Sequence, residues 1–324
     1  MYMPEFTLAR PASLADAARL LSEPDARVLA GGTDLIPNLR RGLGAPRVLV
    51  SLESVKELGG IDLATEGLRI GAGVTVAQLA GAVELDIAYR AVREAAGAIA
   101  APTHRAVATL GGNLCLDTRC VYYNQSEWWR HANEYCLKHR GDTCHVAPQG
   151  KLCRAAYSGD LAPALIALGA RVELASAGSK SRVLPLADLY HEDGAHHLTL
   201  APGEILVAAH VPAPAAGTRS AYLKTRVRGA IDFPLAGVAM ALAVEDERIS
   251  HLRVALTGTN SRPFPLEDTE ALIGKTPDAA AGDALAKLVQ RQASPTRTTL
   301  IAADYRRQAA AALTKRLLAR LAAA

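Results

Sequence analysis

Two short stretches, LAGGTDL at residues 29–35 and TLGGNLC at residues 109–115, share one pattern. Each has an apolar lead-in, two glycines, a small polar residue and then an apolar residue. Glycine lets a ligand approach the main chain closely, and exposed N–H groups near a helix start attract phosphate oxygens. A single such turn is often only a tight turn, but two in one domain predict a cradle for a dinucleotide with a pyrophosphate.

The polar residues of the two turns refine this prediction. Thr33 and Asn113 can each add a side-chain hydrogen bond to a ligand. Asp34 would repel a phosphate, so we expect it to cap the next helix or to accept a hydrogen bond from a ligand hydroxyl. The stretch IGAGVTV has Gly71 and Gly73 but no third glycine, so it is not the Rossmann fingerprint.

Strand and helix patterns alternate around the first turn. Residues 13–23 have apolar side chains at helical spacing behind a serine N-cap. The first glycine turn follows a short strand and starts a helix that ends near Gly42, and residues 47–52 form a second strand. This is a βαβ-like unit. Thr75 and Gln78 have the spacing of a capping box.

The second half of the chain changes character. Residues 157–176 predict a helix that runs into a strand, and the next strands form a mainly antiparallel arrangement. Residues 211–220 are rich in Pro, Ala and Gly and predict a linker. Beyond it, strands are followed by two helices, near 276–293 and 300–322, which indicates a second α+β unit.

Composition excludes several classes of protein. The 324 residues suggest two domains, and 50% hydrophobic with 21% charged residues indicates a globular chain. The net charge of +4 is small and the basic residues are scattered, so we expect no nucleic-acid partner. The N-terminus has acids and prolines in place of a signal peptide, and no apolar run reaches the roughly 18 residues that span a membrane. We therefore expect a cytoplasmic protein with reduced cysteines.

The two glycine turns together resemble the FAD-binding medium subunit of the molybdenum hydroxylase family, which includes xanthine dehydrogenase and carbon monoxide dehydrogenase. Residues 158–170, 222–242 and 303–313 resemble further segments of that family, so the resemblance covers almost the whole chain. It implies an α+β fold with a two-part FAD-binding domain of the vanillyl-alcohol oxidase (PCMH) type over residues 1–215. A small α+β C-terminal domain of the CO dehydrogenase flavoprotein type would follow over residues 216–324.

The resemblance also implies roles for particular residues. The first turn would wrap the FAD pyrophosphate with Leu29, Ala30, Gly31, Gly32, Thr33, Asp34 and Leu35. The second turn would complete the cradle with Thr109, Leu110, Gly111, Gly112 and Asn113. Asp160 would hold a ribityl or adenosine-side hydroxyl, and Lys224 would lie near the flavin edge. Without the resemblance, Asp160 would be interpreted as a surface helix cap and Lys224 as a solvated lysine. No catalytic acid, base or nucleophile is assigned to this chain.

This sequence departs from the family pattern in an insert of roughly 40 residues, at 116–156. A loop-rich segment this short needs a stabilising cross-link or a bound metal. We expect five aromatic residues to form a small core of its own: Tyr122, Tyr123, Trp128, Trp129 and Tyr135.

Four of the five cysteines lie within the insert, and Cys115 directly precedes it. Cys120, Cys136, Cys144 and Cys153 are too widely spaced for a zinc knuckle but suit a [4Fe–4S] cluster, whose four irons each take one thiolate. Cys115 follows the second turn directly, so we assign it as a buried thiol outside the ligand set. Zinc remains an alternative, as does a Cys₃His site with one histidine of the insert (His131, His139 or His145). Thiols that are merely buried or joined in disulfides are the remaining alternative.

The cysteine set closely resembles the insert of 4-hydroxybenzoyl-CoA reductase β subunits, which carries a [4Fe–4S] cluster. This resemblance implies an electron relay from ferredoxin through the cluster and FAD to a small subunit with two [2Fe–2S] clusters. A separate molybdenum-cofactor large subunit would convert 4-hydroxybenzoyl-CoA to benzoyl-CoA in anaerobic aromatic degradation, within a dimer of heterotrimers. The alternatives are an FAD subunit of an oxidising molybdenum hydroxylase and a zinc-stapled docking subunit without enzymatic activity.

Overall fold

The first sheet holds the first glycine turn. The structure, a computed structural model, describes residues 3–85, 87–178 and 181–323. Three parallel strands lie in the order β1-β3-β2 and are connected by two helices: β1 (Thr7–Ala9), β2 (Ala26–Leu29), β3 (Val48–Ser51), α1 (Leu14–Leu21) and α2 (Leu35–Arg40). The serine N-cap of α1 and the βαβ unit are confirmed.

The second sheet is antiparallel, with the strand order β4-β5-β8-β6-β7. Its strands are β4 (Ile61–Ala64), β5 (Gly67–Gly71), β6 (Arg171–Ala175), β7 (Arg182–Pro185) and β8 (Ile205–Pro212). Helices link them: α3 (Val76–Gly81), α4 (Arg90–Ala98), α5 (Pro102–Arg105), α6 (Leu110–Leu114) and α8 (Leu161–Ala167). The predicted capping box at the start of α3 is confirmed, with both reciprocal hydrogen bonds present.

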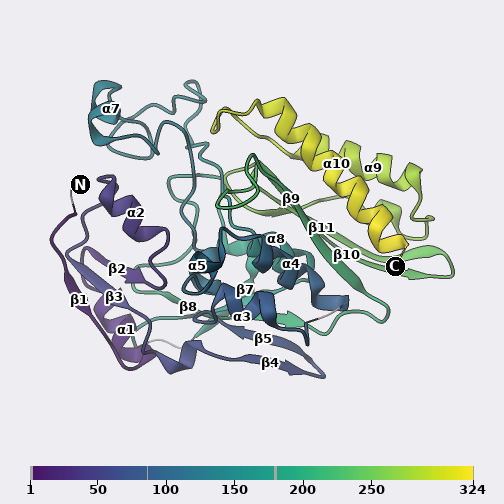
Figure 1. The fold of residues 1–324 in the computed structure, drawn as a ribbon, viewed down its shortest axis with the longest axis horizontal. Helices are drawn as coiled ribbons and strands as arrows, with labels where there is room; N and C mark the ends of the chain where they lie inside the picture. The colour runs from purple at the N-terminus through teal and green to yellow at the C-terminus, as the bar shows by residue number, and fades with distance from the viewer. Residues whose placement is uncertain (1–2, 86, 179–180, 324) are drawn as a thin grey trace.

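The third sheet forms the C-terminal part. Four antiparallel strands lie in the order β12-β11-β10-β9, namely β9 (Arg219–Thr225), β10 (Ala236–Glu245), β11 (Arg248–Thr257) and β12 (Phe264–Pro265). Two long helices, α9 (Ala279–Gln292) and α10 (Ala303–Ala322), pack together against this sheet (Figure 1). Short 3₁₀ turns complete the chain: η1 (Lys56–Leu58), η2 (Ile87–Tyr89), η3 (Leu186–Leu189) and η4 (Thr269–Leu272). The α+β fold class is confirmed.

The predicted linker is shorter than its composition indicated. Strand β8 continues to Pro212 and β9 begins at Arg219, so both strands extend into the range 211–220. Val211 pairs with Leu68, and Arg219 pairs with Leu242. Ladder hydrogen bonds and burial therefore override the turn-like composition at both ends. The main core also includes residues of the third sheet, so the two parts pack directly on each other.

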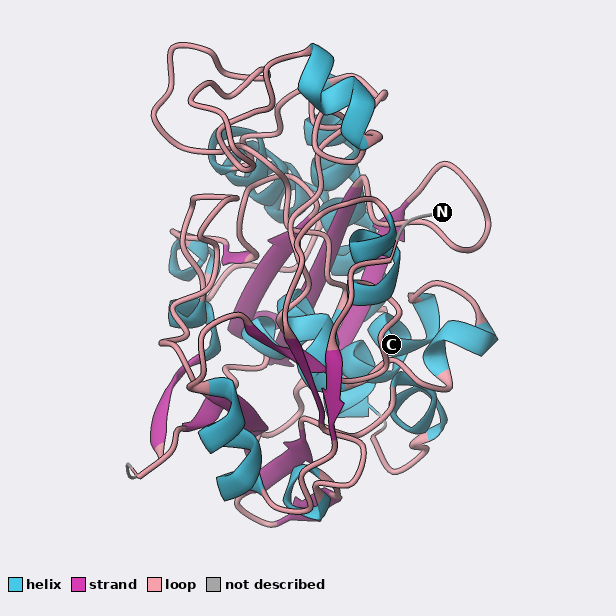
Figure 2. Cartoon of the chain, turned by 90° about the vertical axis from the view of Figure 1, so that its left-hand side faces the viewer, coloured by secondary structure: helices cyan, strands magenta, loops and turns pink. Residues whose placement is uncertain are grey.

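The insert stands apart from the sheets. In Figures 1 and 2 it forms the loops at the top of the molecule around α7 (Glu127–Ala132). The expectation of a five-aromatic core is wrong for Trp128, which is 77% exposed on α7. An arginine fills the centre instead: Arg130, 1% exposed, donates to the Arg41 carbonyl at 2.8 Å and to Glu127 at 2.6 Å. Arg130 thereby fastens the insert to the end of α2.

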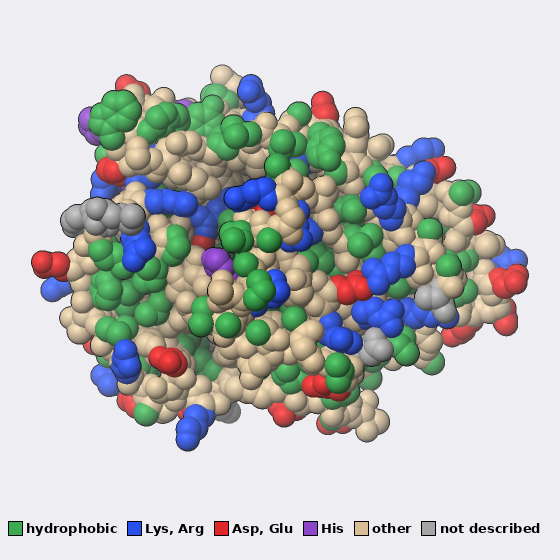
Figure 3. Space-filling view, viewed as in Figure 1, with side chains coloured by type: hydrophobic (Ala, Val, Ile, Leu, Met, Phe, Trp, Pro, Cys, Tyr) green, Lys and Arg blue, Asp and Glu red, His purple; other side chains and the backbone are tan. Residues whose placement is uncertain are grey.

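The surface agrees with the small net charge. On the face drawn in Figure 3, Lys and Arg side chains are spread among acidic and hydrophobic ones. Among the residues that the structure describes, no helix has the length and apolar character needed to cross a membrane.

Candidate functional site

A large cavity of about 1910 Å³ opens between the two glycine turns. This exceeds the ~300–1,000 Å³ of common small-molecule pockets and suits a dinucleotide. Most of the predicted cradle lines it: Ala30, Gly31, Gly32, Thr33, Asp34, Leu35, Thr109, Gly111, Gly112, Asn113 and Asp160. Leu29 ends strand β2 and Leu110 is buried in the core, so neither side chain lines the cavity.

The first turn presents a row of open backbone donors. The N–H groups of residues 30–35 donate to no acceptor among the residues that the structure describes. These residues are half-buried and lie at the start of α2, where the helix leaves its first N–H groups unpaired. Gly32 has φ +69, the left-handed conformation that turns the chain into the helix. The row fits an anion such as a pyrophosphate.

The two turns touch each other. A Cβ added at Gly31 would lie 2.0 Å from the carbonyl oxygen of Val107 and 2.8 Å from the Ala108 nitrogen. Only glycine permits this approach, so Gly31 holds the first turn against the segment that leads into the second.

The second turn is built differently, because its amides are paired. Leu110 N–H donates to Val74 at 2.9 Å and Gly111 N–H donates to Ala72 at 2.8 Å. Gly112 N–H donates to the hydroxyl of Thr109, the N-cap of α6, at 3.1 Å. Asn113 accepts from Leu161 N–H at 3.0 Å through Oδ1. The second turn therefore offers the cavity its glycine surface and the Thr109 hydroxyl, with fewer open N–H groups.

The Asp34 side chain does not cap helix α2, so the first of its two expected roles is wrong; acceptance from a ligand hydroxyl stays a prediction. Its side chain makes no capping hydrogen bond but forms an ion pair with Arg119 of the insert, whose side chain is 11% exposed. Arg119 also donates to Asn38 Oδ1 at 3.1 Å and lies over the Phe233 ring, 5.1 Å from its centroid. Burial lowers the pKa of Arg119 to about 10, so it stays charged at neutral pH. The pair neutralises the carboxylate that would oppose a phosphate.

Asp160 and Lys224 meet each other. Asp160 is 3% exposed and lies 3.0 Å from Lys224 Nζ, and the Tyr222 hydroxyl donates to it at 2.6 Å. Burial raises the pKa of Asp160 and lowers the pKa of Lys224, each against the attraction of the other group. Asp160 lines the cavity, whereas Lys224 does not. Both side chains are buried, so Asp160 is not a surface helix cap and Lys224 is not a solvated lysine.

A second, smaller cavity lies within the insert. Cys120, Cys136, Cys144 and Cys153 all line it, together with His145. Cys115 does not line it, because it lies in the wall of the large cavity, where burial raises its pKa to about 12. Cys115 therefore lines one cavity and the other four cysteines line another, which is the same division that the sequence analysis made.

The four thiols are not drawn together as metal ligands. Over the described part of the chain, no group of three or more His, Cys, Asp or Glu side chains could hold a metal ion as placed. All five cysteines are free thiols. The interaction between the Cys144 and Cys153 side chains lowers the pKa of Cys144 and raises that of Cys153. A thiolate here is the form that binds iron or zinc.

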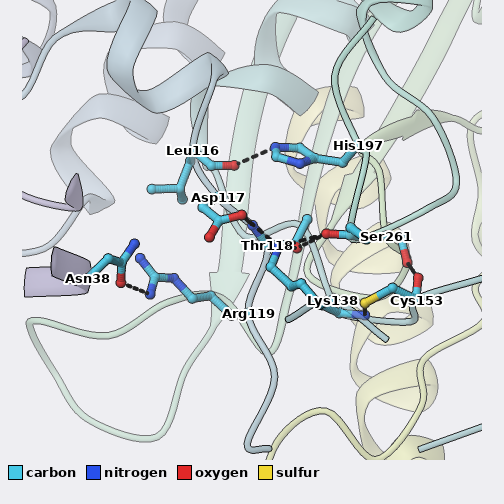
Figure 4. Close-up of polar contacts among 12 residues, drawn as sticks. Asn38, Leu116, Asp117, Thr118, Arg119, Lys138, Cys153, His197 and Ser261 are labelled. Atoms are coloured by element: carbon cyan, nitrogen blue, oxygen red, sulfur yellow. Dashed lines mark hydrogen bonds and ion pairs between the residues drawn. The ribbon is translucent and has the colours of Figure 1, made fainter. Parts of the chain in front are cut away.

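Sequence reasoning missed the polar residues that connect the insert to the large cavity. Arg119 points toward Asn38, and Lys138 lies near Asp117 and Thr118 (Figure 4). Lys138 and Tyr123 line both cavities. The one available signal was the position of Arg119, immediately before a candidate ligand cysteine.

Two family models match nearly the whole chain. Residues 4–214 match the FAD binding domain in molybdopterin dehydrogenase, and residues 220–321 match the CO dehydrogenase flavoprotein C-terminal domain. The chain belongs to this family of FAD-binding subunits. It is therefore an FAD-binding oxidoreductase subunit of the molybdenum hydroxylase family.

Curated relatives agree. The aldehyde oxidoreductase FAD-binding subunit PaoB of Escherichia coli is 32% identical over 84% of this chain and 87% of its own length. The carbon monoxide dehydrogenase medium chain of Afipia carboxidovorans is 29% identical over 97% of this chain and 96% of its own length.

Solved structures agree as well. A chain of the Cu,Mo-CO dehydrogenase in its cyanide-inactivated form matches with a TM-score of 0.82 and 28% identity, over 100% of this chain and 99% of that chain. A chain of quinoline 2-oxidoreductase from Pseudomonas putida 86, at 24% identity and a TM-score of 0.76, shares the fold.

Proposed function

We propose that this chain is an electron-transfer subunit that holds both FAD and a [4Fe–4S] cluster in a molybdenum enzyme. The observation that carries the proposal is the pair of neighbouring cavities. One lies between the glycine turns, the other is lined by four cysteines, and Lys138 and Tyr123 are in the wall of both. A subunit that relays electrons between two redox groups must hold them close together, and it needs no substrate site of its own.

FAD fits the large cavity through the first turn. The open N–H groups of residues 30–35 would hold the pyrophosphate, with the Asp34 charge balanced by Arg119. Thr109, Gly111, Gly112 and Asn113 would line the other side, and Asp160 would accept from a hydroxyl of the ribityl or adenosine portion. Lys224 would act at the flavin edge through Asp160. When bound, FAD supplies both one-electron and two-electron transfer.

The insert fits an iron–sulfur cluster by its donor set. Four thiols line one cavity whose other walls are largely aromatic or apolar, among them Tyr122, Tyr123, Leu137 and Val146. Four thiolates are the ligand set of a [4Fe–4S] cluster, which would supply one-electron transfer. Zinc is the alternative, with His145 available for a Cys₃His site.

Metal analysis of the anaerobically purified full-length chain tests this assignment. We expect about four irons per chain with broad absorbance near 400 nm, and the same iron content in Cys115→Ser. Zinc in a colourless protein would reject the cluster and support a docking role for the insert.

We assign the subunit first to reductive chemistry, as a 4-hydroxybenzoyl-CoA reductase subunit of aromatic degradation in the cytoplasm. The support is the cysteine insert, whose extra redox group suits a low-potential donor such as ferredoxin. The partners would be a molybdenum-cofactor large subunit and a small subunit with two [2Fe–2S] clusters, in a dimer of heterotrimers.

A second candidate is an oxidising enzyme with the same subunits. It is favoured by the names of the relatives, which include an aldehyde oxidoreductase, carbon monoxide dehydrogenases and xanthine dehydrogenase subunits. The purified complex distinguishes the two. The reductase assignment predicts benzoyl-CoA formation from 4-hydroxybenzoyl-CoA with reduced ferredoxin. Reduction of the complex by an aldehyde, with no dehydroxylation, would favour the oxidising assignment.

A further inference from the structure

Lys138 lies at the boundary between the two cavities. It follows Cys136 in the insert, its side chain is 6% exposed, and it lines both cavities. Its Nζ lies 4.8 Å from the centroid of the Tyr123 ring, the other residue in both walls. A buried cation in this position acts on both redox sites through a medium of low dielectric constant.

Hydrogen bonds fix this cation in place. Lys138 Nζ donates to Asp117 Oδ1 at 2.6 Å, to the Gly194 carbonyl at 2.7 Å and to the Thr118 hydroxyl. An ammonium group has three protons, so all of them are used. The position of the charge is therefore set by the fold, unlike that of a solvated lysine.

The counter-charge lies on the other side. Asp117 lines the large cavity but not the thiol cavity, and its side chain is 30% exposed. Water screens this carboxylate more than it screens the buried ammonium. Of the two charged residues, Lys138 lines the thiol cavity and Asp117 does not.

We propose that Lys138 is a potential-setting residue, whose buried cation raises the reduction potential of the cluster held by the four cysteines. The inference rests on the proposed function. Reduction adds one electron and one negative charge to the cluster, and a neighbouring cation stabilises the more negative state. Lys138 therefore favours electron occupancy of the cluster beside the flavin, and Asp117 limits the size of that effect.

The test is a redox titration of the full-length chain, with dithionite as the electron source and the reduced cluster followed by electron paramagnetic resonance. Lys138→Met should lower the midpoint potential by about 59 mV, a tenfold change for a one-electron couple. Lys151→Met removes the same charge from an exposed site of the insert and should shift it far less. Equal potentials in these two variants would overturn the inference.

A second variant keeps the test decisive if Lys138→Met fails to fold. Asp117→Asn leaves the cation without its carboxylate, so the potential should rise; no change or a fall would overturn the inference. Iron and visible absorbance of the unmodified chain are measured first. Their absence would reject the cluster itself, whereas a normal cluster with an unresponsive potential would reject only the role of Lys138.

Discussion

The two glycine turns are similar in sequence and different in construction. In the first, the N–H groups of residues 30–35 have no acceptor among the described residues. In the second, the N–H groups of Leu110, Gly111 and Gly112 are all paired within the protein. The same double glycine therefore accompanies open N–H groups in one turn and paired N–H groups in the other.

The difference shows what a glycine pattern can and cannot indicate. Glycine removes a side chain, and what uses the vacated space depends on the neighbouring segment. At Gly111 that neighbour is Ala72, whose Cβ would lie 2.9 Å from an added Cβ. At Gly31 the neighbour is the Val107 carbonyl oxygen, which would lie 2.0 Å from an added Cβ. The N–H groups of residues 30–35 are not used in this contact, and these residues line the cavity.

The largest expected effect is on stability, and it comes from adding a Cβ to a glycine of each turn. In Gly31→Ala the new Cβ meets backbone atoms at 2.0 to 2.8 Å, and backbone cannot rotate away. We expect a loss of about 3 kcal/mol in the free energy of unfolding, with loss of bound FAD. Gly112→Ala is the matched control, since its nearest contact is the Thr109 hydroxyl at 3.2 Å. Equal melting temperatures and FAD contents in the two variants would contradict the structural contrast.

The second expected effect concerns the structural turn and its pH dependence. His197 is 7% exposed and donates to the Leu116 carbonyl at 2.9 Å, just beyond the second turn. Burial first, and then the Lys138 cation, lowers its pKa from 6.5 to about 4. Between these values the unfolded chain binds more protons, so stability falls as pH falls through this window.

The loss from this histidine should reach about 2 kcal/mol between pH 7 and pH 5. Denaturant unfolding at both pH values measures it, and His197→Gln should lack this part of the slope. The same pH dependence in the variant and the unmodified chain would remove His197 as the cause.

The third effect tests whether the ion pair with Arg119 lets the Asp34 carboxylate lie beside a bound phosphate. Asp34→Asn leaves the buried Arg119 without its carboxylate, which should cost about 1.5 kcal/mol of unfolding free energy without weakening FAD binding. Arg119→Met leaves the acid unbalanced beside the phosphate and should weaken FAD binding about tenfold.

The exposed pair of Arg69 and Asp62 supplies the control for this test. Asp62 is 66% exposed, so Asp62→Asn should change stability by less than about 0.5 kcal/mol. Calorimetry of FAD binding and denaturant unfolding give the two readouts. Weaker FAD binding in Asp34→Asn than in Arg119→Met would reverse the assigned roles.

The fold was predictable because its signals are local. The capping box of Thr75 and Gln78 and the strand, turn and helix around residues 26–40 follow from spacing within a few residues. The family resemblance of the two glycine turns gave the rest of the α+β architecture, and the family models agree with it.

The site was only partly predictable because its electrostatics connect distant segments. Nothing near Asp34 in sequence shows that Arg119 of the insert neutralises it, so a helix cap was the natural expectation. The exposure of Trp128 and the burial of Arg130 likewise depend on how α7 rests on the end of α2. Cys115 lines a different cavity from the other four cysteines because it directly follows the second turn; the role of those four as metal ligands stays a prediction.

The smallest expected effect is also the one that best separates binding from packing. Thr109 and Thr33 occupy different positions in the two turns, and their hydroxyls have different partners. The Thr109 hydroxyl accepts from Gly112 N–H at 3.1 Å, whereas the Thr33 hydroxyl has no partner within the described residues. Thr109→Val should therefore cost about 1 kcal/mol of unfolding free energy in the FAD-free chain, as the loss of an N-cap does.

Thr33→Val should leave the stability of the FAD-free chain within about 0.5 kcal/mol of the original. Its FAD affinity should fall about fivefold, or about 1 kcal/mol, because a hydroxyl that faces the cavity is lost. Unfolding of the FAD-free chains and titration with FAD separate the two outcomes. If both variants lost stability and neither lost affinity, the first turn would be a packing turn like the second, and the open N–H row would not be the flavin cradle.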